Sequence, residues 1–196
     1  MINENNKLVS NYIKDYAMSM LARSVYDVTF SEYGKPYAHD MAISQMVSSL
    51  ELLIKSKLIE TDPFCIFNEN ITSIDWNDEN ILLNLKTKAY MELPKILKDK
   101  LSIIVDESIY KELGMKRNRA IHLGNLTIEN KTEYVLKSVF EFILPLIMSM
   151  EIEIEPFFIF LGEWDEVLFD GYLLEQIELF KINVPKNLKN KIESYA

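Results

Sequence analysis

One short segment, from Lys116 to Asn125, holds the side chains of this 196-residue chain that are best suited to chemistry on a phosphate. In a helix, each residue turns by about 100° relative to the one before it. Asn118 and His122 are four positions apart, so a helix places them on one face, beside Arg117. Arginine can hold a phosphate through two parallel hydrogen bonds, and imidazole can transfer protons near neutral pH. The spacing therefore indicates a phosphate-binding group next to an acid or base.

The same segment also has a purely structural interpretation. At helical spacing, Arg117 projects from an apolar stripe, where a guanidinium needs an anionic or hydrogen-bonding partner. The stripe consists of Ile109, Tyr110, Leu113, Ala120 and Ile121. Glu51 interrupts an apolar run and is the carboxylate that we expect to pair with Arg117. His122 would then be a cation favoured by a helix C-terminus, with Gly124 as the stop signal. Spacing leaves both interpretations open.

The helix that presents this segment is expected from Ser102 to Leu123, as a buried helix with Gly114 inside it. Apolar spacing and stop signals predict further helices along the chain. These are Asn6 to Val28, Tyr37 to Glu60, Tyr90 to Lys100, Asn130 to Met150, Asp165 to Phe180 and Pro185 to Tyr195. The two long N-terminal helices are separated by Gly34-Lys35-Pro36, and Asp62-Pro63 ends the second. The chain is thus expected to be mainly helical.

Some details of these elements can also be predicted. In the first helix an apolar residue recurs every fourth position, which predicts its buried stripe. The stripe consists of Leu8, Tyr12, Tyr16 and Met20, with Ile13, Ala17 and Leu21 alongside. The second helix should be central and buried from Leu50 to Ile54. Residues 64–85 are expected to form a loop with a short hairpin, and the alternation from Glu151 to Glu155 predicts a strand or another extended segment. Pro145 predicts a kink in the helix that ends at Met150.

Composition narrows the function classes. The 21 basic and 30 acidic residues give a net charge of −9, which excludes a protein that binds nucleic acid by bulk charge. The charge is segregated, however. Residues 138–180 hold ten acidic and no basic residues, whereas residues 86–119 hold nine basic and five acidic residues, a net charge of +4. A local basic cleft that contacts a few phosphates of a single strand stays open. The acidic stretch is interpreted as a surface that faces a partner or excludes RNA.

Few residues are available as metal ligands. Two histidines and one cysteine cannot build a zinc site from nitrogen and sulfur ligands alone, so we expect no metal and no other cofactor.

The most apolar stretch, Phe142 to Met150, has nine residues, about half of what a bilayer crossing requires. We therefore expect a cytoplasmic protein that does not bind a membrane.

The residues from Arg117 to His122, with Asn118 directly after the arginine, resemble the signature of the HEPN family. In that signature an arginine is followed by a polar residue and, a few positions later, by a histidine. The segment from Glu51 to Lys55 also resembles an early-helix segment that is common in bacterial members. The resemblance extends from about Asn6 to Met150. It implies an all-α fold, with one HEPN-like helical bundle over residues 1–150. Residues 151–196 lie outside the resemblance, and we expect them to form a helical C-terminal extension packed on the same domain.

The resemblance also implies an activity, that of a metal-independent endoribonuclease of the toxin or antiphage-defence type. His122 would act as general acid or base, Arg117 would stabilise the pentavalent phosphate, and Asn118 would orient the phosphate or the imidazole. Lys116 and Arg119 would bind RNA. Because each chain offers one motif histidine and cyclising cleavage needs both a base and an acid, we expect a homodimer with a composite site and a 2′,3′-cyclic phosphate product.

A second function class stays open, because some members of that family are not enzymes. In this alternative the chain is a catalytically inert helical module that binds a partner protein or a nucleotide. RNA is the expected substrate of the nuclease, and an antitoxin or regulatory protein is a further expected partner. Two copies of Arg117 and His122 that meet at a cleft would favour the nuclease.

Overall fold

The computed structural model describes residues 4–30, 37–78, 80, 84–123, 128–162 and 171–194. Nearly all regular structure in these residues is helical, and the β structure among them is one isolated antiparallel bridge between Phe67 and Thr87. The predicted all-α class is therefore confirmed. The predicted short hairpin is reduced to this bridge, in which Asn68 N donates to Lys86 O at 2.9 Å and Lys88 N donates to Ile66 O at 2.7 Å.

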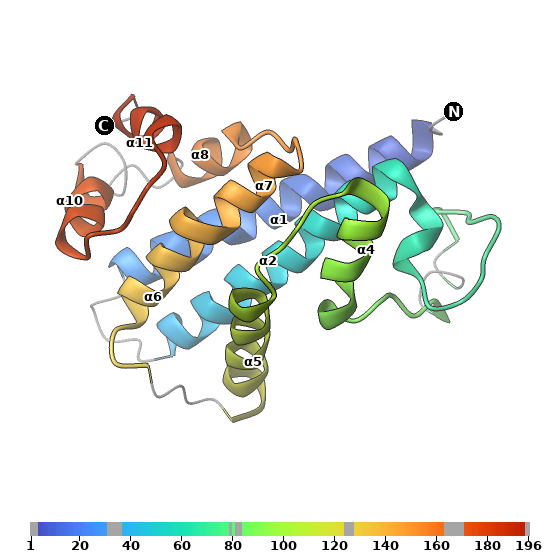
Figure 1. The fold of residues 1–196 in the computed structure, drawn as a ribbon, viewed down its shortest axis with the longest axis horizontal. Helices are drawn as coiled ribbons and strands as arrows, with labels where there is room; N and C mark the ends of the chain where they lie inside the picture. Colours follow the sequence, from blue (N-terminus) through green and yellow to red (C-terminus); the bar gives the residue numbers. More distant parts are fainter. Residues whose placement is uncertain are drawn as a thin grey trace.

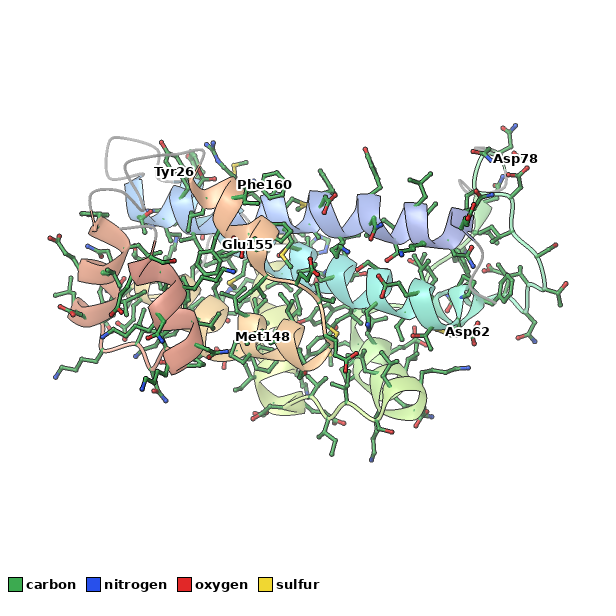
Figure 2. All side chains as sticks on the ribbon, turned by 90° about the horizontal axis from the view of Figure 1, so that it is seen from above. Tyr26, Asp62, Asp78, Met148, Glu155 and Phe160 are labelled. Carbon is green, nitrogen blue, oxygen red and sulfur yellow. The ribbon has the colours of Figure 1, made fainter. Side chains whose placement is uncertain are left out.

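Two long helices, α1 (Glu4–Phe30) and α2 (Ala38–Thr61), form the backbone of the fold and pack along each other. Tyr26, near the end of α1, and Asp62, directly after α2, lie at opposite ends of the molecule, so the two helices run antiparallel (Figure 2). Both helices match the prediction to within two residues at each end. The central part of α2 is buried as expected, because Leu50, Leu53 and Ile54 have no exposed surface.

The predicted stripe of α1 is confirmed only in part. Ala17 and Leu21 are buried as expected, whereas Leu8, Tyr12 and Tyr16 are between 56% and 76% exposed. The buried apolar residues of α1 are Ala17, Met18, Leu21, Ala22, Val25 and Val28. The physical reason is that a step of four residues turns a helix by about 400°, so residues at this spacing drift by about 40° per step around the axis. A buried face needs a mixture of three- and four-residue steps, and the buried residues from Ala17 to Val28 have this spacing.

Among the described residues, two 3₁₀ helices and a short α-helix lie between α2 and the helix that carries the Arg117 segment. They are η1 (Pro63–Ile66), η2 (Tyr90–Glu92) and α4 (Leu93–Leu101), with Pro94 in the first turn of α4. Ser102 ends α4 in the left-handed conformation, with φ of 58°. The predicted start of the next helix at Ser102 is therefore wrong. That helix, α5 (Glu107–Leu123), begins after Asp106, whose carboxylate accepts hydrogen bonds from the backbone of Ser108 and Ile109 at 3.0 and 3.2 Å.

The next helical run passes through a change of helix type. Asn130 caps α6 (Lys131–Lys137) by accepting a hydrogen bond from Glu133 N at 3.1 Å, as its position predicted. The run then continues through the π-helical segment η3 (Ser138–Ile143) into α7 (Leu144–Ser149). Pro145 lies in the first turn of α7. The interruption therefore falls directly before Pro145, in the turn whose backbone bonds this proline cannot complete.

The C-terminal part of the described chain is also helical. It consists of α8 (Glu155–Gly162), α10 (Tyr172–Leu179) and α11 (Lys186–Glu193). The alternation from Glu151 to Glu155 does not form a strand: Glu151 is in a turn with φ of 57°, residues 152–154 have no regular secondary structure, and Glu155 opens α8. The buried rings of Phe157 and Phe158 fix α8 on α1, and Figure 1 shows α10 and α11 together at one end of the long helices. The first part of the helix predicted from Asp165 lies outside the described residues.

Candidate functional site

The Arg117 segment lies on a helix at the periphery of the fold. Figure 1 shows α5 crossing α2 and reaching away from the bundle, and its main helix contact is with α2. The expectation of a buried helix is therefore wrong for its last turns. Ile121 is 59% exposed, whereas Tyr110, Leu113 and Ala120 are buried. The stripe narrows toward the C-terminus because α5 contacts the bundle on one side only.

A pair of stacked tyrosines supports the middle of α5. The rings of Tyr90 and Tyr110 lie 4.0 Å apart, with an angle of 7° between their planes. Each hydroxyl donates to the other residue's backbone carbonyl: Tyr90 Oη to Tyr110 O at 3.1 Å, and Tyr110 Oη to Tyr90 O at 2.9 Å. Both side chains are buried. This reciprocal pair fixes η2 against α5 and presents the other face of the Tyr90 ring to the next turn.

Gly114 lies on α5 where that ring comes closest to the helix. A Cβ atom at this position would lie 2.7 Å from Tyr90 Cε1 and 2.9 Å from Tyr90 Cδ1, well inside van der Waals contact. The Tyr90 ring cannot move away easily, because it is buried, stacked and hydrogen-bonded. Glycine is therefore required here for close packing, although it is a weak helix former.

Replacing Gly114 with alanine is expected to lower the free energy of unfolding by about 1–3 kcal/mol, because the added methyl group overpacks a rigid contact. Urea denaturation checks this, with Ser108→Ala at an exposed position of the same helix as the control. Helix propensity alone predicts the opposite sign, a gain of up to about 1 kcal/mol. A stabilised Gly114→Ala protein would therefore contradict the close packing of Tyr90.

Arg117 lies one turn after Gly114, between an aromatic ring and a carboxylate. Its guanidinium carbon lies 5.0 Å from the centre of the Tyr90 ring, a cation–π distance. Its Nη1 donates to Glu51 Oε2 at 2.5 Å, and the two side chains are 18% and 19% exposed. The structure thus brings together Arg117 and Glu51, the two residues that sequence reasoning paired. The guanidinium is held in place on two sides.

Glu51 belongs to a short polar chain that continues away from Arg117. Its other oxygen, Oε1, accepts a hydrogen bond from Lys55 Nζ at 2.7 Å, and Lys55 Nζ also donates to Thr87 Oγ1 at 3.0 Å. Burial favours the neutral form of this carboxyl, but the hydrogen bonds and charges of Lys55 and Arg117 outweigh it, so the pKa of Glu51 lies below its ordinary value. Glu51 is therefore a carboxylate shared by two cations.

This lowered pKa predicts how stability depends on pH. Because the pKa of Glu51 is lower in the folded protein than its ordinary value of 4.5, the charged form stabilises the fold above about pH 4.5. That contribution is lost as the pH falls through the folded-state pKa. We expect Glu51→Gln to remove it, so that the stability of the variant falls less steeply below pH 4.5 than that of the wild type. Chemical denaturation between pH 3 and 7 measures both slopes, and equal slopes would contradict the shift. Glu153→Gln, at an exposed position, is the matched control.

The other predicted site residues lie on the last two turns of α5. Asn118, Arg119 and His122 are exposed, and Lys116 is half-buried. Asn118 Oδ1 lies 3.4 Å from both Nε and Nη2 of Arg117, which is a long hydrogen bond. A guanidinium has five N–H donors, so Arg117 keeps donors for a further anion after it binds Glu51. One chain therefore presents a fixed arginine, an amide and an imidazole on an open helix end.

Uncovered apolar side chains surround this helix end. A hollow of about 320 Å³ lies between the start of α2 and the end of α5, and both apolar residues and the polar residues Asp40, Ser44 and Gln45 line it. Tyr37, Met41 and Ile121 contribute to it, and each is more than half exposed. Leu123, at the end of α5, is 69% exposed. Contiguous apolar surface of this kind is typical of a protein–protein contact.

Two searches over the described residues bear on metals and membranes. No group of three or more His, Cys, Asp or Glu side chains in this part of the chain is arranged to hold a metal ion. Within the same residues, no helix combines the length and the apolar character needed to cross a bilayer. Cys65 is half-buried, and burial raises the pKa of its thiol to about 11, so it is not activated as a nucleophile.

Sequence reasoning missed the residues that support Arg117 and its partner Glu51. Tyr90 and Tyr110 are twenty positions apart, and Lys55 and Thr87 are thirty-two apart, so helical spacing cannot relate them. The available signal was Gly114, a glycine inside a helix, which often indicates that another group packs closely against the backbone.

The chain itself gives no match to a family model, to a curated protein or to a solved structure.

Proposed function

We propose that this chain is a metal-independent endoribonuclease whose site is completed by a second copy of the chain. The observation that carries the proposal is the fixed guanidinium of Arg117 on the exposed end of α5, next to Asn118 and one turn from His122. A preorganised cation with donors to spare is suited to stabilising the charge that develops on a phosphate. We retain the HEPN-like resemblance as part of this proposal.

The proposed reaction is a transfer of the phosphodiester from the 5′-oxygen to the 2′-oxygen of the ribose. One His122 takes the proton of the 2′-hydroxyl as this oxygen attacks phosphorus, and the second His122 gives a proton to the leaving 5′-oxygen. Arg117 stabilises the pentavalent phosphate, and Asn118 orients the phosphate or the imidazole. The products are a 2′,3′-cyclic phosphate and a free 5′-hydroxyl. Lys116 and Arg119 contact neighbouring phosphates.

The requirement for two chains follows from this chemistry and is supported by the surface around the motif. Acid and base act on opposite sides of phosphorus, and each chain has one histidine in the motif. Tyr37, Met41, Ile121 and Leu123 supply uncovered apolar area beside that histidine. A homodimer that buries this area would bring two motif helices together. A toxin or antiphage-defence effector, restrained by an antitoxin or regulatory protein in the cytoplasm, is the biological role that we propose for such a nuclease.

The proposal is tested by incubating purified wild-type protein with single-stranded RNA in the presence of EDTA. We expect cleavage that EDTA does not reduce, with 2′,3′-cyclic phosphate ends detected by mass spectrometry, and a dimer in sedimentation equilibrium. RNA in which the 2′-hydroxyl is replaced by a 2′-methoxy group is the matched substrate control, because it lacks the attacking nucleophile. Cleavage of this RNA at the same rate would refute the proposed reaction.

A second candidate function has its own supporting observation. Arg117 Nη1 already binds Glu51, and this contact alone would satisfy an arginine at the edge of a core. In this alternative the chain is an inert helical module, and the exposed end of α5 binds a partner protein or a nucleotide. A dimer or partner complex without any EDTA-resistant cleavage of RNA would favour this function.

A further inference from the structure

A second and larger hollow lies on the other side of α5. It has a volume of about 770 Å³, within the range of sites that hold ligands, and separates the first turn of α5 from α6 and η3. We call it the acidic groove. Its principal lining residues are Ile109, Ile128, Glu133, Tyr134, Glu141 and Phe142. Arg117, Asn118 and His122 do not line it, so it is separate from the proposed nuclease site.

The charge of the acidic groove is negative. Three carboxylates line it, those of Glu129, Glu133 and Glu141, and the one cation among the lining residues is Lys137. The groove thus has a net charge of −2. Lys137 Nζ lies 2.6 Å from Glu133 Oε1 and is already bound by a carboxylate of the groove itself. A phosphate would meet repulsion here, which excludes RNA as the natural occupant.

The groove also has apolar lining residues, beside the polar side chains of Asn130 and Ser138. Ile109 is 40% exposed, and Ile128 and Phe142 are partly buried. The hydroxyl oxygen of Tyr134 is shielded from solvent, so it is not open to a bound partner. The apolar surface offered by the groove is therefore that of Ile109, Ile128 and Phe142.

The helix that forms one wall is the part of the chain that changes helix type. Its wall residues fall into two rows at a spacing of four. The first row is Glu133, Lys137 and Glu141, and the second is Tyr134, Ser138 and Phe142. Both rows run from α6 into η3. A π-helical segment is rare and occurs frequently at functional sites. The wall therefore presents a charged row beside a row that carries the aromatic rings of Tyr134 and Phe142, the pattern that an amphipathic partner would match.

We propose that the acidic groove binds a basic, amphipathic helical segment of a partner protein. Apolar side chains of the segment pack on Ile109 and Phe142. Its lysine or arginine side chains lie against the second carboxylate oxygens of Glu133 and Glu141, because the Oε1 atoms already accept hydrogen bonds from Lys137 Nζ and Asn183 N. This is the general mode in which an amphipathic helix lies in a groove. The proposal does not depend on RNA cleavage.

The test uses the full chain and a fluorescein-labelled helical peptide of about 14 residues, with leucine on one face and lysine on the other. Fluorescence anisotropy measures its affinity. We expect Glu133→Gln combined with Glu141→Gln to weaken binding at least about tenfold at low salt, because two charge contacts are lost. The matched control is Glu153→Gln combined with Glu175→Gln, which removes the same charge at exposed positions outside the groove and should leave the affinity within about twofold.

The site of binding is checked on the wild-type protein, so that the test stands even if a variant fails to fold. We expect the peptide to shift the NMR resonances of the Ile109 methyl groups and the Phe142 ring, and to leave those of Leu8 and Leu179 unchanged. Equal affinity for the two double variants would overturn the proposal, as would shifts confined to other surfaces. Full displacement of the peptide by spermine at equal charge concentration would also overturn it, because the apolar face would then contribute nothing. A dimer that dissociates in an Ile109→Glu variant would instead assign the groove to a second copy of the chain.

Discussion

Replacing His122 with alanine is expected to lower the rate of RNA cleavage by about 10²- to 10⁴-fold, the range typical of a lost acid or base. In the proposed homodimer the substitution removes both the base and the acid, so the upper part of this range applies. His122 is exposed at the end of α5, and alanine is a better helix former than histidine. The thermal midpoint should therefore remain within a few degrees of the wild type. Single-turnover cleavage of a labelled RNA measures the rate.

The control for this substitution is His39→Ala, since His39 is the other histidine of the chain. It lies in the first turn of α2, and we expect its replacement to change the rate by less than about threefold. A mixed dimer of wild-type and His122→Ala chains keeps one imidazole, so it separates the loss of one proton-transfer group from the loss of both. An His122→Ala protein that cleaves RNA at the wild-type rate would remove the central element of the proposed mechanism and leave the inert helical module.

The long helices were predictable because local sequence determines them. In α2 the apolar density around Leu53 and the stop signal at Asp62 act within a few residues, and the structure agrees with both. The start of α5 was not predictable, because both Ser102 and Asp106 are compatible with a helix start in the sequence. Only the left-handed conformation of Ser102, which ends α4, excludes the earlier start. The exposed face of α1 was also mispredicted, because tyrosine counts as apolar and yet its hydroxyl tolerates a surface position.

The candidate site likewise has a part that local sequence determines and a part that depends on tertiary packing. The spacing of Arg117, Asn118 and His122 follows from helix geometry, and the ion pair to Glu51 follows from the need to satisfy a guanidinium beside a core. The Tyr90–Tyr110 stack depends instead on how the chain returns to α5 after the loop, which is a tertiary property. The acidic groove likewise depends on where α5 and α6 diverge. The acidic stretch expected from residue 138 contributes one carboxylate to it, that of Glu141, and the other two precede that stretch.

Replacing Arg117 with lysine is expected to lower kcat for RNA cleavage about hundredfold, the lower end of the range for the loss of one preorganised donor group. Lysine keeps the positive charge and can still bind Glu51, but it lacks the planar fork that bonds a carboxylate and a phosphate at once. It also loses the stacking on Tyr90, which contributes about 0.5–1 kcal/mol to stability. We therefore expect a large loss of activity with a small loss of stability. Cleavage kinetics and urea denaturation measure the two effects on the same sample.

The size of the loss in kcat relative to the loss in stability distinguishes a catalytic arginine from a structural one. If Arg117 serves only to neutralise Glu51, lysine should replace it with nearly full activity, and Glu51→Gln should be the more damaging change. Glu51→Gln leaves two cations, the half-buried Arg117 and the buried Lys55, without their shared anion, at a cost of about 1–3 kcal/mol. Arg23→Lys, the same substitution on α1, is the matched control and should not affect kcat. An Arg117→Lys protein that keeps wild-type kcat while losing stability would show that the guanidinium only supports the fold, because the transition-state charge would then not depend on its geometry.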